Sequence, residues 1–402
     1  MRQFLIGGEI IEEEADGFQR RLTLAYHGKL RPLCLCKGPG VPMYIAQIGV
    51  ELVIKRMPFS GGDHDPSCHS YEPPHELSGL GPLLGNAIKV DAAGMADLRL
   101  DFSLSKRGTL NGTNMSMNAG DLDSVRSDGK KLSLRALLHL LWHGSGLTEW
   151  TAHWIGKRHW WQVYHHLVEA TRSMLIRGDN LSERLFVPEP FRIDDKAAIE
   201  QRRAQALAGL FQRAATPRKL MLLIGEVKEF TPARSGQQVV IKHMPGFRLH
   251  LEEITWQRLP RRFEAELGLW RSNDTLHLIA IATIEGTASG LVTINEISLM
   301  TVTEQWLPIE NAYEERLLAK LIRQRGKMVK GLRFNLSKDQ PLANAILPEQ
   351  RPRPFALYIV PPNADDQFEA ILAKMRATRP DLASWVWRVA KGEMPPLPWE
   401  PS

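Results

Sequence analysis

The sequence predicts a multidomain α+β protein. Its 402 residues exceed the length of one typical domain, about 100 to 200 residues. Hydrophobic residues make up 43% of the chain and charged residues 24%, as in soluble globular proteins. The spacing of apolar residues changes twice: a β-rich beginning gives way to helices near residue 132, and strands return near residue 219. These changes divide the chain into the predicted domains 1–105, 132–215, 219–308 and 309–402.

The first predicted domain, residues 1–105, is β-rich. Val41 to Gln47 and Val50 to Met57 are apolar segments on either side of a glycine, and together they predict a β-hairpin. Ala96 to Leu104 alternates between apolar and polar residues and predicts a closing strand. Residues 106–131 are dominated by Ser, Gly, Asn and Asp, which indicates a linker.

All three cysteines of the chain lie in this first domain. Cys34, Cys36 and Cys68 fall in one 35-residue window that also contains His64. Three thiolates and one imidazole are the ligand set of a closed, tetrahedral zinc site. The hairpin between them returns the chain toward the Cys-x-Cys turn. We therefore predict a structural zinc ion bound by Cys34, Cys36, His64 and Cys68.

Alternatives to this site stay open. His69 and His75 are rival imidazole ligands, and buried free cysteines are common in protein cores. A disulfide is disfavoured, because the number of thiols is odd and the chain begins with acidic residues rather than a secretory signal. The longest apolar runs are too short to span a membrane. The sequence therefore predicts a cytoplasmic protein without a membrane partner.

The middle of the chain predicts a helical, tryptophan-rich region (132–215) and then a β-rich domain (219–308). Leu132 to Arg177 has helical spacing with a break at Gly144, and Lys157 and Arg158 lie among tryptophans. Within it, the stretch from Leu147 to Leu167, with Lys157, Arg158 and four tryptophans, fits either a helix-turn-helix-like reader of DNA or an amphipathic helix pair that packs on its neighbours. A further helix is expected near Leu259 to Trp270, between strands.

Residues 309–402 predict the order helix, three strands, helix, strand, with Glu314 or Glu315 on the first helix. This order resembles the αβββαβ core of the PD-(D/E)xK nucleases, the restriction-endonuclease-like fold. In that superfamily an aspartate on the second strand and an acid-x-lysine on the third hold magnesium and activate water. Here Asn344 stands nearest the aspartate, and Leu357-Tyr358-Ile359 contains neither acid nor lysine. The resemblance implies a nuclease-like fold without catalytic residues.

Positive charge is concentrated in the first part of this region. The formal net charge is +6, and the segment from Arg316 to Arg333 holds seven Lys or Arg residues and no acid. A solvated surface would explain such a run. The nucleic-acid interpretation assigns the phosphate contacts to Lys320, Arg323, Lys327, Lys330 and Arg333.

Two other functions are compatible with the sequence. Glu226-Val227-Lys228 places a carboxylate and an ammonium two residues apart on a predicted strand, which gives an E-x-K element for a metal-dependent nuclease. A same-face ion pair is the simpler explanation. The tryptophan-rich helices could instead make the protein an interaction scaffold for plasmid transfer or replication.

Several motifs resemble a family of bacterial proteins, domain of unknown function 1173. They include Cys34-Leu35-Cys36, the stretch from His64 to Pro74, and the C-terminal Lys330-Gly331-Leu332-Arg333. The resemblance implies a protein carried by plasmids and integrative elements. The prediction is thus a zinc-containing, mobile-element protein that binds nucleic acid without cutting it, with a protein partner from the same element as a further expectation.

Overall fold

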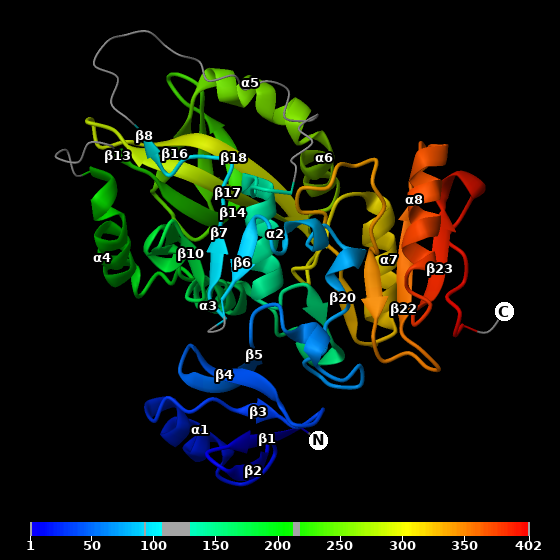
Figure 1. Cartoon of the computed structure of the whole chain (residues 1–402). Coiled ribbons are helices and arrows are strands. Elements are labelled where there is room, and N and C mark those ends of the chain that lie inside the picture. The colour runs from blue at the N-terminus through cyan, green and yellow to red at the C-terminus, as the bar shows by residue number, and fades with distance from the viewer. Residues whose placement is uncertain (1, 92–93, 107–128, 212–217, 401–402) are drawn as a thin grey trace.

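The computed structural model describes residues 2–91, 94–106, 129–211 and 218–400, and it has the expected α+β composition. Figure 1 shows a small N-terminal lobe below a larger body. The left part of the body is built around long strands, and the right part contains the C-terminal sheet with two helices.

The N-terminal lobe is one antiparallel sheet with a single helix. Its strands run in the order β2-β1-β3-β4-β5. The predicted hairpin is confirmed as β4 and β5, which meet at Gly49, where φ is 64°. Helix α1 (Phe18–His27) buries only Leu22 and Ala25 in the core of the lobe. The strands are β1 (Gln3–Ile6), β2 (Glu9–Glu12), β3 (Leu33–Cys34), β4 (Val41–Ile48) and β5 (Glu51–Arg56).

Helix α2 (Leu134–Gly144) lies at the centre of the body. Ser133 caps it by accepting a hydrogen bond from the backbone N–H of Ala136. Nearly all of its side chains are buried, and the indole of Trp142 donates to the carbonyl of Trp306 at 3.0 Å.

The segment 147–167 contains one α-helix, the start of α3 (Trp160–Thr171), and a single helical turn instead of two helices. Its Arg158 is buried and donates to the backbone carbonyls of Leu147 and Gln305. The packing interpretation of this segment therefore fits better than the helix-turn-helix one.

Around α2 lie the remaining elements of the middle region. A four-stranded sheet has the order β11-β10-β7-β6, and its strand β7 is shorter than the predicted strand at 96–104. The elements are β6 (Ile88–Val90), β7 (Ala96–Leu98), β8 (Ser105–Lys106), β9 (Glu149–Trp150), α3 (Trp160–Thr171), β10 (Met174–Ile176), β11 (Asp179–Asn180), β12 (Leu185–Phe186), α4 (Lys196–Leu207) and β13 (Arg218–Lys219), of which β8 pairs with β13.

Five strands between residues 221 and 302 close into a barrel. Its order is β14-β15-β16-β18-β17, and β17 pairs again with β14. All neighbours are antiparallel except β16 and β18. Between the third and fourth strands the single predicted helix is observed as two, which meet at Phe263. The elements are β14 (Met221–Pro232), β15 (Gln237–Ile241), β16 (Arg248–Leu251), α5 (Glu253–Arg262), α6 (Glu264–Ser272), β17 (His277–Gly286) and β18 (Val292–Val302).

Alternate side chains of the barrel strands point to two different cores. Leu223, Val239 and Leu249 fill the interior together with residues of α5 and α6. Ile224 and Ile281 face outward and pack in the core that contains α2. The barrel is thus covered by α2 on the β14–β17–β18 side.

The C-terminal sheet has the order β23-β22-β21-β20-β9. Strands β20, β21 and β22 form an antiparallel meander, and β23 returns parallel to β22 after helix α8. The predicted order of elements is confirmed, although β20 ends six residues earlier than expected and β9 comes from the middle region. The elements are β19 (Pro308–Ile309), which extends the barrel beside β18, α7 (Ala312–Arg323), β20 (Met328–Lys330), β21 (Ala345–Leu347), β22 (Phe355–Val360), α8 (Asp366–Ala377) and β23 (Ala383–Arg388).

One hydrophobic core joins all four predicted domains. It includes Leu80, Trp142, Ile224 and Phe334, one from each segment. The four segments therefore pack on one another. Within the described ranges, no helix has the length and hydropathy needed to cross a membrane.

Gly331 tests this packing. A Cβ atom at Gly331 would lie 1.9 Å from the carbonyl oxygen of Ala343 on the facing segment, so Gly331→Ala forces the backbones apart. We expect the free energy of unfolding to fall by about 1 to 3 kcal/mol in urea denaturation. Gly268→Ala in α6 is the control, because its Cβ meets nothing within 4 Å and alanine favours the helix. Equal stability of both variants would contradict the described approach of the two segments.

Candidate metal centre

The cysteine window folds around one point. Cys34 ends β3 and pairs with Phe4 of β1 and Val41 of β4, which fixes its position in the lobe. Cys36 follows in the turn after β3, and His64 follows the single helical turn Gly61–Asp63. The hairpin β4–β5 lies between these two parts of the window, as the sequence predicts.

The four ligand atoms lie close together. The Sγ atoms of Cys34 and Cys68 are 3.7 Å apart, and the Nδ1 atom of His64 lies 3.3 Å from Cys36 Sγ and 3.7 Å from Cys68 Sγ. All four atoms are within 4.8 Å of one another. His64 is buried, and its Nε2 atom has no hydrogen-bond partner. This cluster could hold a metal ion with ligands from the protein alone.

A local turn positions Cys68. The carboxylate of Asp65 accepts hydrogen bonds from the backbone N–H of Ser67 at 2.8 Å and from its hydroxyl at 2.6 Å. The N–H of Cys68 then donates to the Asp65 carbonyl at 2.8 Å. Asp65 thus caps a turn that is not followed by a helix. The backbone N–H of Ser70 points to Cys68 Sγ at 3.4 Å, which favours a thiolate.

The three sulfurs compete for negative charge. The hydrogen bond from Cys34 lowers the pKa of Cys68 to about 3, against the effect of burial, and contacts with His64 and the Ser70 amide act in the same direction. The same bond to Cys68, together with burial, raises the pKa of Cys34. Burial likewise raises the pKa of Cys36. A bound cation would remove this competition, because metal binding favours thiolates.

The two rival histidines lie elsewhere. The Nε2 atom of His75 is 3.4 Å from the Phe59 carbonyl, and its ring meets those of Phe59 and His143 edge-on. The backbone carbonyl of His69 accepts a hydrogen bond from Lys327. Neither belongs to the metal cluster found among the described residues. The structure thus selects His64 as the imidazole of the cluster.

Arg56 connects this window to the body. Its guanidinium forms ion pairs with the buried Glu72, just after the window, and with Glu149 of β9 at 2.7 Å. Glu72 packs directly against the backbone of Gly61. Only glycine fits at that position, because a Cβ there would lie 2.4 Å from Glu72 Cβ. The metal cluster is therefore attached to the C-terminal sheet through β9.

The five predicted phosphate-binding cations do not form one surface. Lys330 is buried and pairs with Glu314 at 2.9 Å. Arg333 pairs with Glu310 at 2.8 Å. Lys327 donates a hydrogen bond to the His69 carbonyl at 2.8 Å. Buried, paired cations do not reach a phosphate, so the prediction has to be corrected for these three. Lys320 is partly exposed and lies 2.6 Å from Glu400, and Arg323 is exposed.

Glu314 is at the centre of a buried polar cluster. Its Oε1 atom accepts hydrogen bonds from Lys330 Nζ at 2.9 Å and Asn344 Nδ2 at 2.6 Å, and its Oε2 atom accepts from the N–H of Glu310 at 2.8 Å. The Oδ1 atom of Asn344 accepts from the N–H of Ile359 at 2.7 Å. The helix glutamate and the asparagine that the nuclease resemblance singled out thus meet, with an ammonium group on the carboxylate.

Glu226 and Lys228 do not form an E-x-K element. A β-bulge between Val227 and Glu229 interrupts the alternation of β14, so Glu226 is buried while the Lys228 side chain is 62% exposed. The partners of Glu226 are Lys242 Nζ at 2.9 Å and His277 Nδ1 at 2.7 Å. Burial opposes ionisation of Glu226, but these two donors outweigh it and lower its pKa. Sequence spacing gave no signal for these distant partners.

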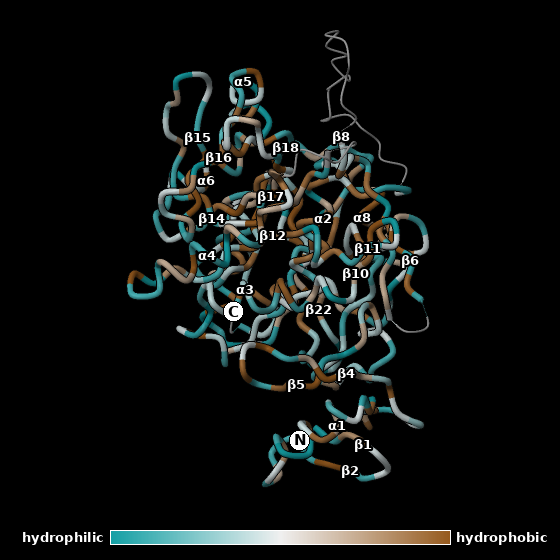
Figure 2. The backbone as a smooth tube through the Cα atoms, turned by 90° about the vertical axis from the view of Figure 1, so that its left-hand side faces the viewer, coloured by the Kyte–Doolittle hydropathy of each residue, from teal (hydrophilic) through white to brown (hydrophobic). Residues whose placement is uncertain are grey.

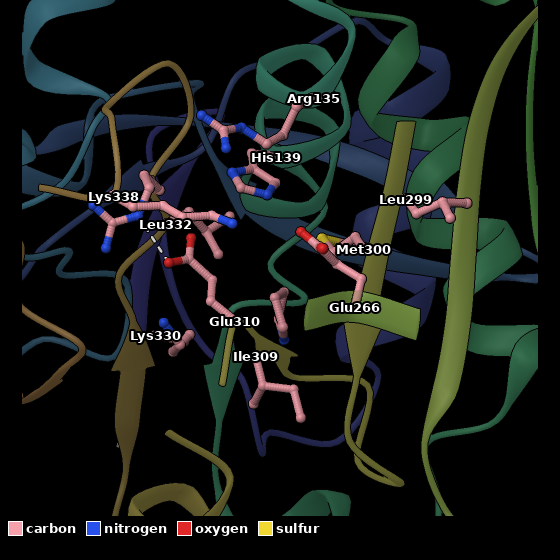
Figure 3. A pocket seen from close by; sticks show the side chains of 12 residues that line it. Arg135, His139, Glu266, Leu299, Met300, Ile309, Glu310, Lys330, Leu332 and Lys338 are labelled. Carbon is pink, nitrogen blue, oxygen red and sulfur yellow. Dashed lines mark hydrogen bonds and ion pairs between the residues drawn. The ribbon is translucent and has the colours of Figure 1, made fainter. Parts of the chain in front are cut away.

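A small polar cavity lies between α2, β20 and the barrel. Figure 3 shows Arg135, His139 and Glu310 directed toward it. Its volume of about 30 Å³ exceeds the roughly 10 to 15 Å³ that one water molecule needs, so it has room for one or a few water molecules. The guanidinium of Arg135 donates to the carbonyls of Phe334 and Leu336 at 2.9 and 3.0 Å, so it is already engaged. The cavity is too small for a substrate, and its charges hold the segments together.

Buried histidines predict acid sensitivity. Burial lowers the pKa of His139 to about 3 and the pKa of His166 to about 4. In the unfolded chain a histidine has a pKa of about 6.5. Between these pKa values the unfolded chain binds more protons than the folded protein. The stability that the neutral, buried histidines give above pH 6.5 is therefore lost as the pH falls.

We therefore expect a lower urea midpoint at pH 5.5 than at pH 7.5. His139→Asn keeps an acceptor for the Phe334 N–H, which His139 Nδ1 now accepts at 2.9 Å, and removes one titrating group. Its midpoint is expected to change less with pH than that of the wild type. Since both proteins keep the metal cluster, its own pH dependence cancels in this comparison. An identical pH dependence would contradict the role of His139.

The metal cluster leads to a prediction of its own. Cys68→Ser removes one of four ligands, so we expect loss of bound metal, measured by elemental mass spectrometry on the dialysed protein, and a lower melting temperature. His75→Gln is the matched control and is expected to keep both metal and stability. Full metal content in Cys68→Ser, or loss of metal in His75→Gln, would refute the ligand assignment.

Comparisons with known proteins identify only the family. No curated protein and no solved structure matches the chain. The family described as "Protein of unknown function (DUF1173)" matches residues 4–390, nearly the whole chain and the entire metal window. The chain therefore belongs to the DUF1173 family.

Proposed function

We propose that this protein is a cytoplasmic nucleic-acid-binding protein of a plasmid or integrative element, with a structural zinc ion and without nuclease activity. The observation that carries this proposal is the topology of the barrel. The strand order 1-2-3-5-4-1, the parallel pair formed by the third and fifth strands, and the helices between the third and fourth strands are those of the OB-fold. Barrels of this kind bind oligonucleotides and oligosaccharides.

The details of the barrel support this assignment. The first strand, β14, has 12 residues and pairs with both the second and the fourth strands, which requires strong curvature. The bulge at Lys228 supplies part of that curvature. Fold alone does not determine function, so the positive net charge is a second and independent support for a polyanionic ligand.

The geometry of the cysteine cluster supports zinc. Zinc bonds of about 2.3 Å to sulfur and about 2.0 Å to nitrogen give a tetrahedron with edges of about 3.8 Å between sulfurs and about 3.5 Å between sulfur and nitrogen. The corresponding distances here are 3.7 Å for Cys34–Cys68 and 3.3 and 3.7 Å for the His64 contacts. All four positions are filled by protein, so the ion would stabilise the lobe rather than act on a substrate.

The C-terminal region supports binding without cleavage. Its order α7, β20, β21, β22, α8, β23, with the last strand parallel to β22, fits the nuclease-like core that the sequence suggests. The ammonium of Lys330 lies where Glu314 and Asn344 would otherwise meet a cation. Glu314 is buried and both of its carboxylate oxygens accept hydrogen bonds, one of them from the ammonium of Lys330, which occupies the place of a metal ion.

A scaffold function is the second candidate. Exposed apolar side chains gather on the N-terminal lobe, among them Leu24 at 66% and Val50 at 94% exposure. Such side chains favour contact with a protein partner of the same mobile element. Binding to that partner and binding to nucleic acid use different parts of the molecule and are compatible.

DNA binding is tested by fluorescence anisotropy with single-stranded and duplex oligonucleotides at 50 and 200 mM salt. We expect binding that weakens strongly with salt, since phosphate contacts release counterions. In parallel, incubation with Mg²⁺ is expected to leave the DNA intact. Absence of binding at 50 mM salt would overturn the proposed function, and magnesium-dependent cleavage that disappears in Glu226→Gln would support the E-x-K nuclease instead.

A further inference from the structure

A second cavity lies between α3, α4, β12 and the turn that follows β15. Its volume is about 250 Å³, whereas an engineered cavity of about 150 Å³ is known to bind benzene, so a small molecule fits. Figure 2 views the molecule from the side on which α4 lies, with α3 and β12 beside it. We call this space the α3–α4 cavity.

The wall of the α3–α4 cavity is mostly apolar. Leu185 and Val187, in and after β12, are buried, and so are Ile199 of α4 and Met244. Val168 of α3 adds to the same wall. Apolar walls with a few polar groups are typical of small-molecule sites, in which the polar groups orient the ligand.

The ring of His243 is a fixed and uncharged part of this wall. It stacks on Trp160, with ring centroids 5.1 Å and planes 12° apart, and its Nδ1 atom accepts from the backbone N–H of Phe191 at 3.4 Å. Burial lowers the pKa of His243 to about 4, so the ring is neutral at pH 7. Glu226 lies 3.8 Å from its Nε2 atom, but Lys242 pairs with that carboxylate at 2.9 Å. The imidazole therefore suits contact with an apolar group of a ligand.

Arg203 of α4 supplies a cation whose hydrogen-bond donors are unused. Only 13% of its side chain is exposed, and its guanidinium lies over the ring of Phe247, 5.0 Å from the centroid. Among the residues that the structure describes, it makes no hydrogen bond, and its one ion pair is with Glu200 at 3.9 Å. A guanidinium has five N–H donors, and donors withdrawn from water need acceptors. Arg203 therefore favours an anion in the cavity.

The charges around the cavity limit that anion to a small one. Arg202 is already bound to both carboxylate oxygens of Glu189, at 2.9 and 2.8 Å. The lining thus holds two cations and one carboxylate, a net charge of +1. Glu200 competes for Arg203 from outside the lining, but the contact is long and the Glu200 side chain is 39% exposed, so it is weak. A single negative charge is balanced here, and a phosphate dianion is not.

Tyr164 of α3 adds a neutral donor to the same lining. Burial raises the pKa of Tyr164, so its hydroxyl stays protonated at pH 7. This hydroxyl makes no hydrogen bond to another described residue. A guanidinium and a phenol hydroxyl are both donors to carboxylate oxygens.

We propose that the α3–α4 cavity binds a small organic carboxylate, whose carboxylate group pairs with Arg203 and whose compact apolar body lies against the apolar wall and His243. The site is separate from the metal cluster, and it does not depend on nucleic-acid binding.

The experiment is isothermal titration calorimetry of the full-length protein at constant ionic strength. The probes are three carboxylates with compact bodies, benzoate, cyclohexanecarboxylate and 4-methylpentanoate, and benzamide is the uncharged counterpart of benzoate. We expect at least one carboxylate to bind with a Kd of about 1 mM or below, as is typical of ligands of this size. Benzamide is expected to bind at least about tenfold more weakly than benzoate, because it cannot form the charged pair.

Three variants locate the binding. Arg203→Gln removes the proposed partner and is expected to weaken carboxylate binding about tenfold or more. Ala206→Phe changes no charge but fills part of the cavity from its exposed rim, and it is expected to weaken all probes. Arg192→Gln is the matched control, because Arg192 is exposed and outside the lining, and it is expected to bind like the wild type. Circular dichroism verifies that each variant is folded.

The opposite results are equally specific. The inference fails if no carboxylate shows binding up to about 10 mM, roughly ten times the expected Kd. It also fails if Arg203→Gln and Ala206→Phe both bind like the wild type, or if Arg192→Gln loses as much affinity as Arg203→Gln, since net charge would then be the cause. Should Arg203→Gln not fold, unchanged binding in Ala206→Phe alone refutes the site. None of these results bears on the proposed nucleic-acid function.

Discussion

The pairing of β14 along both of its edges is the constraint on which the architecture depends. Its register with β17 runs from Met221–Ile284 to Val227–Leu278, and its other edge pairs with β15. These pairings close the barrel, and β12 covers the start of the remaining edge of β14 by pairing with Leu222 and Leu223. The outward side of the same strands then serves as the floor of the core around α2.

The metal cluster solves a different problem. Residues 57–74, which follow β5, contain no strand and only the single helical turn Gly61–Asp63, so few backbone hydrogen bonds of regular structure fix them. The cluster ties this segment to β3, and the ion pairs of Arg56 with Glu72 and Glu149 tie it to β9. A metal at this point would therefore stabilise the junction between lobe and body as well as the lobe itself.

Local chemistry could be predicted from the sequence, and long-range pairing could not. Cys34, Cys36, His64 and Cys68 were predictable because thiol and imidazole ligands at such spacing have few other uses in this chain. The hairpin β4–β5 and the order of C-terminal elements follow from alternation and turn residues. Closure of the barrel joins residues that are more than 40 positions apart. Leu249 pairs with Val292 across two intervening helices, and Met221 pairs with Ile284, so no local pattern encodes the closure.

The basic segment shows the same limit. Its cations are consecutive in sequence, but the partners of Lys330 and Arg333 are Glu314 and Glu310, which precede the segment and face it only after α7 and β20 have packed. Likewise, strand alternation predicts that Glu226 and Lys228 lie on the same face of β14. The bulge between Val227 and Glu229 instead turns their side chains to different sides. The distribution of charge along a chain therefore does not by itself locate a contact surface.

Hydrogen–deuterium exchange of the intact protein, with and without a saturating single-stranded oligonucleotide, tests the central claim most directly. The account predicts slower exchange on binding in residues 228–251, which include β15, β16 and the loop before β15, with α1 and α7 unchanged. Slower exchange confined to α7 and residues 316–333, or to the N-terminal lobe, would contradict it, because the ligand would then bind outside the barrel.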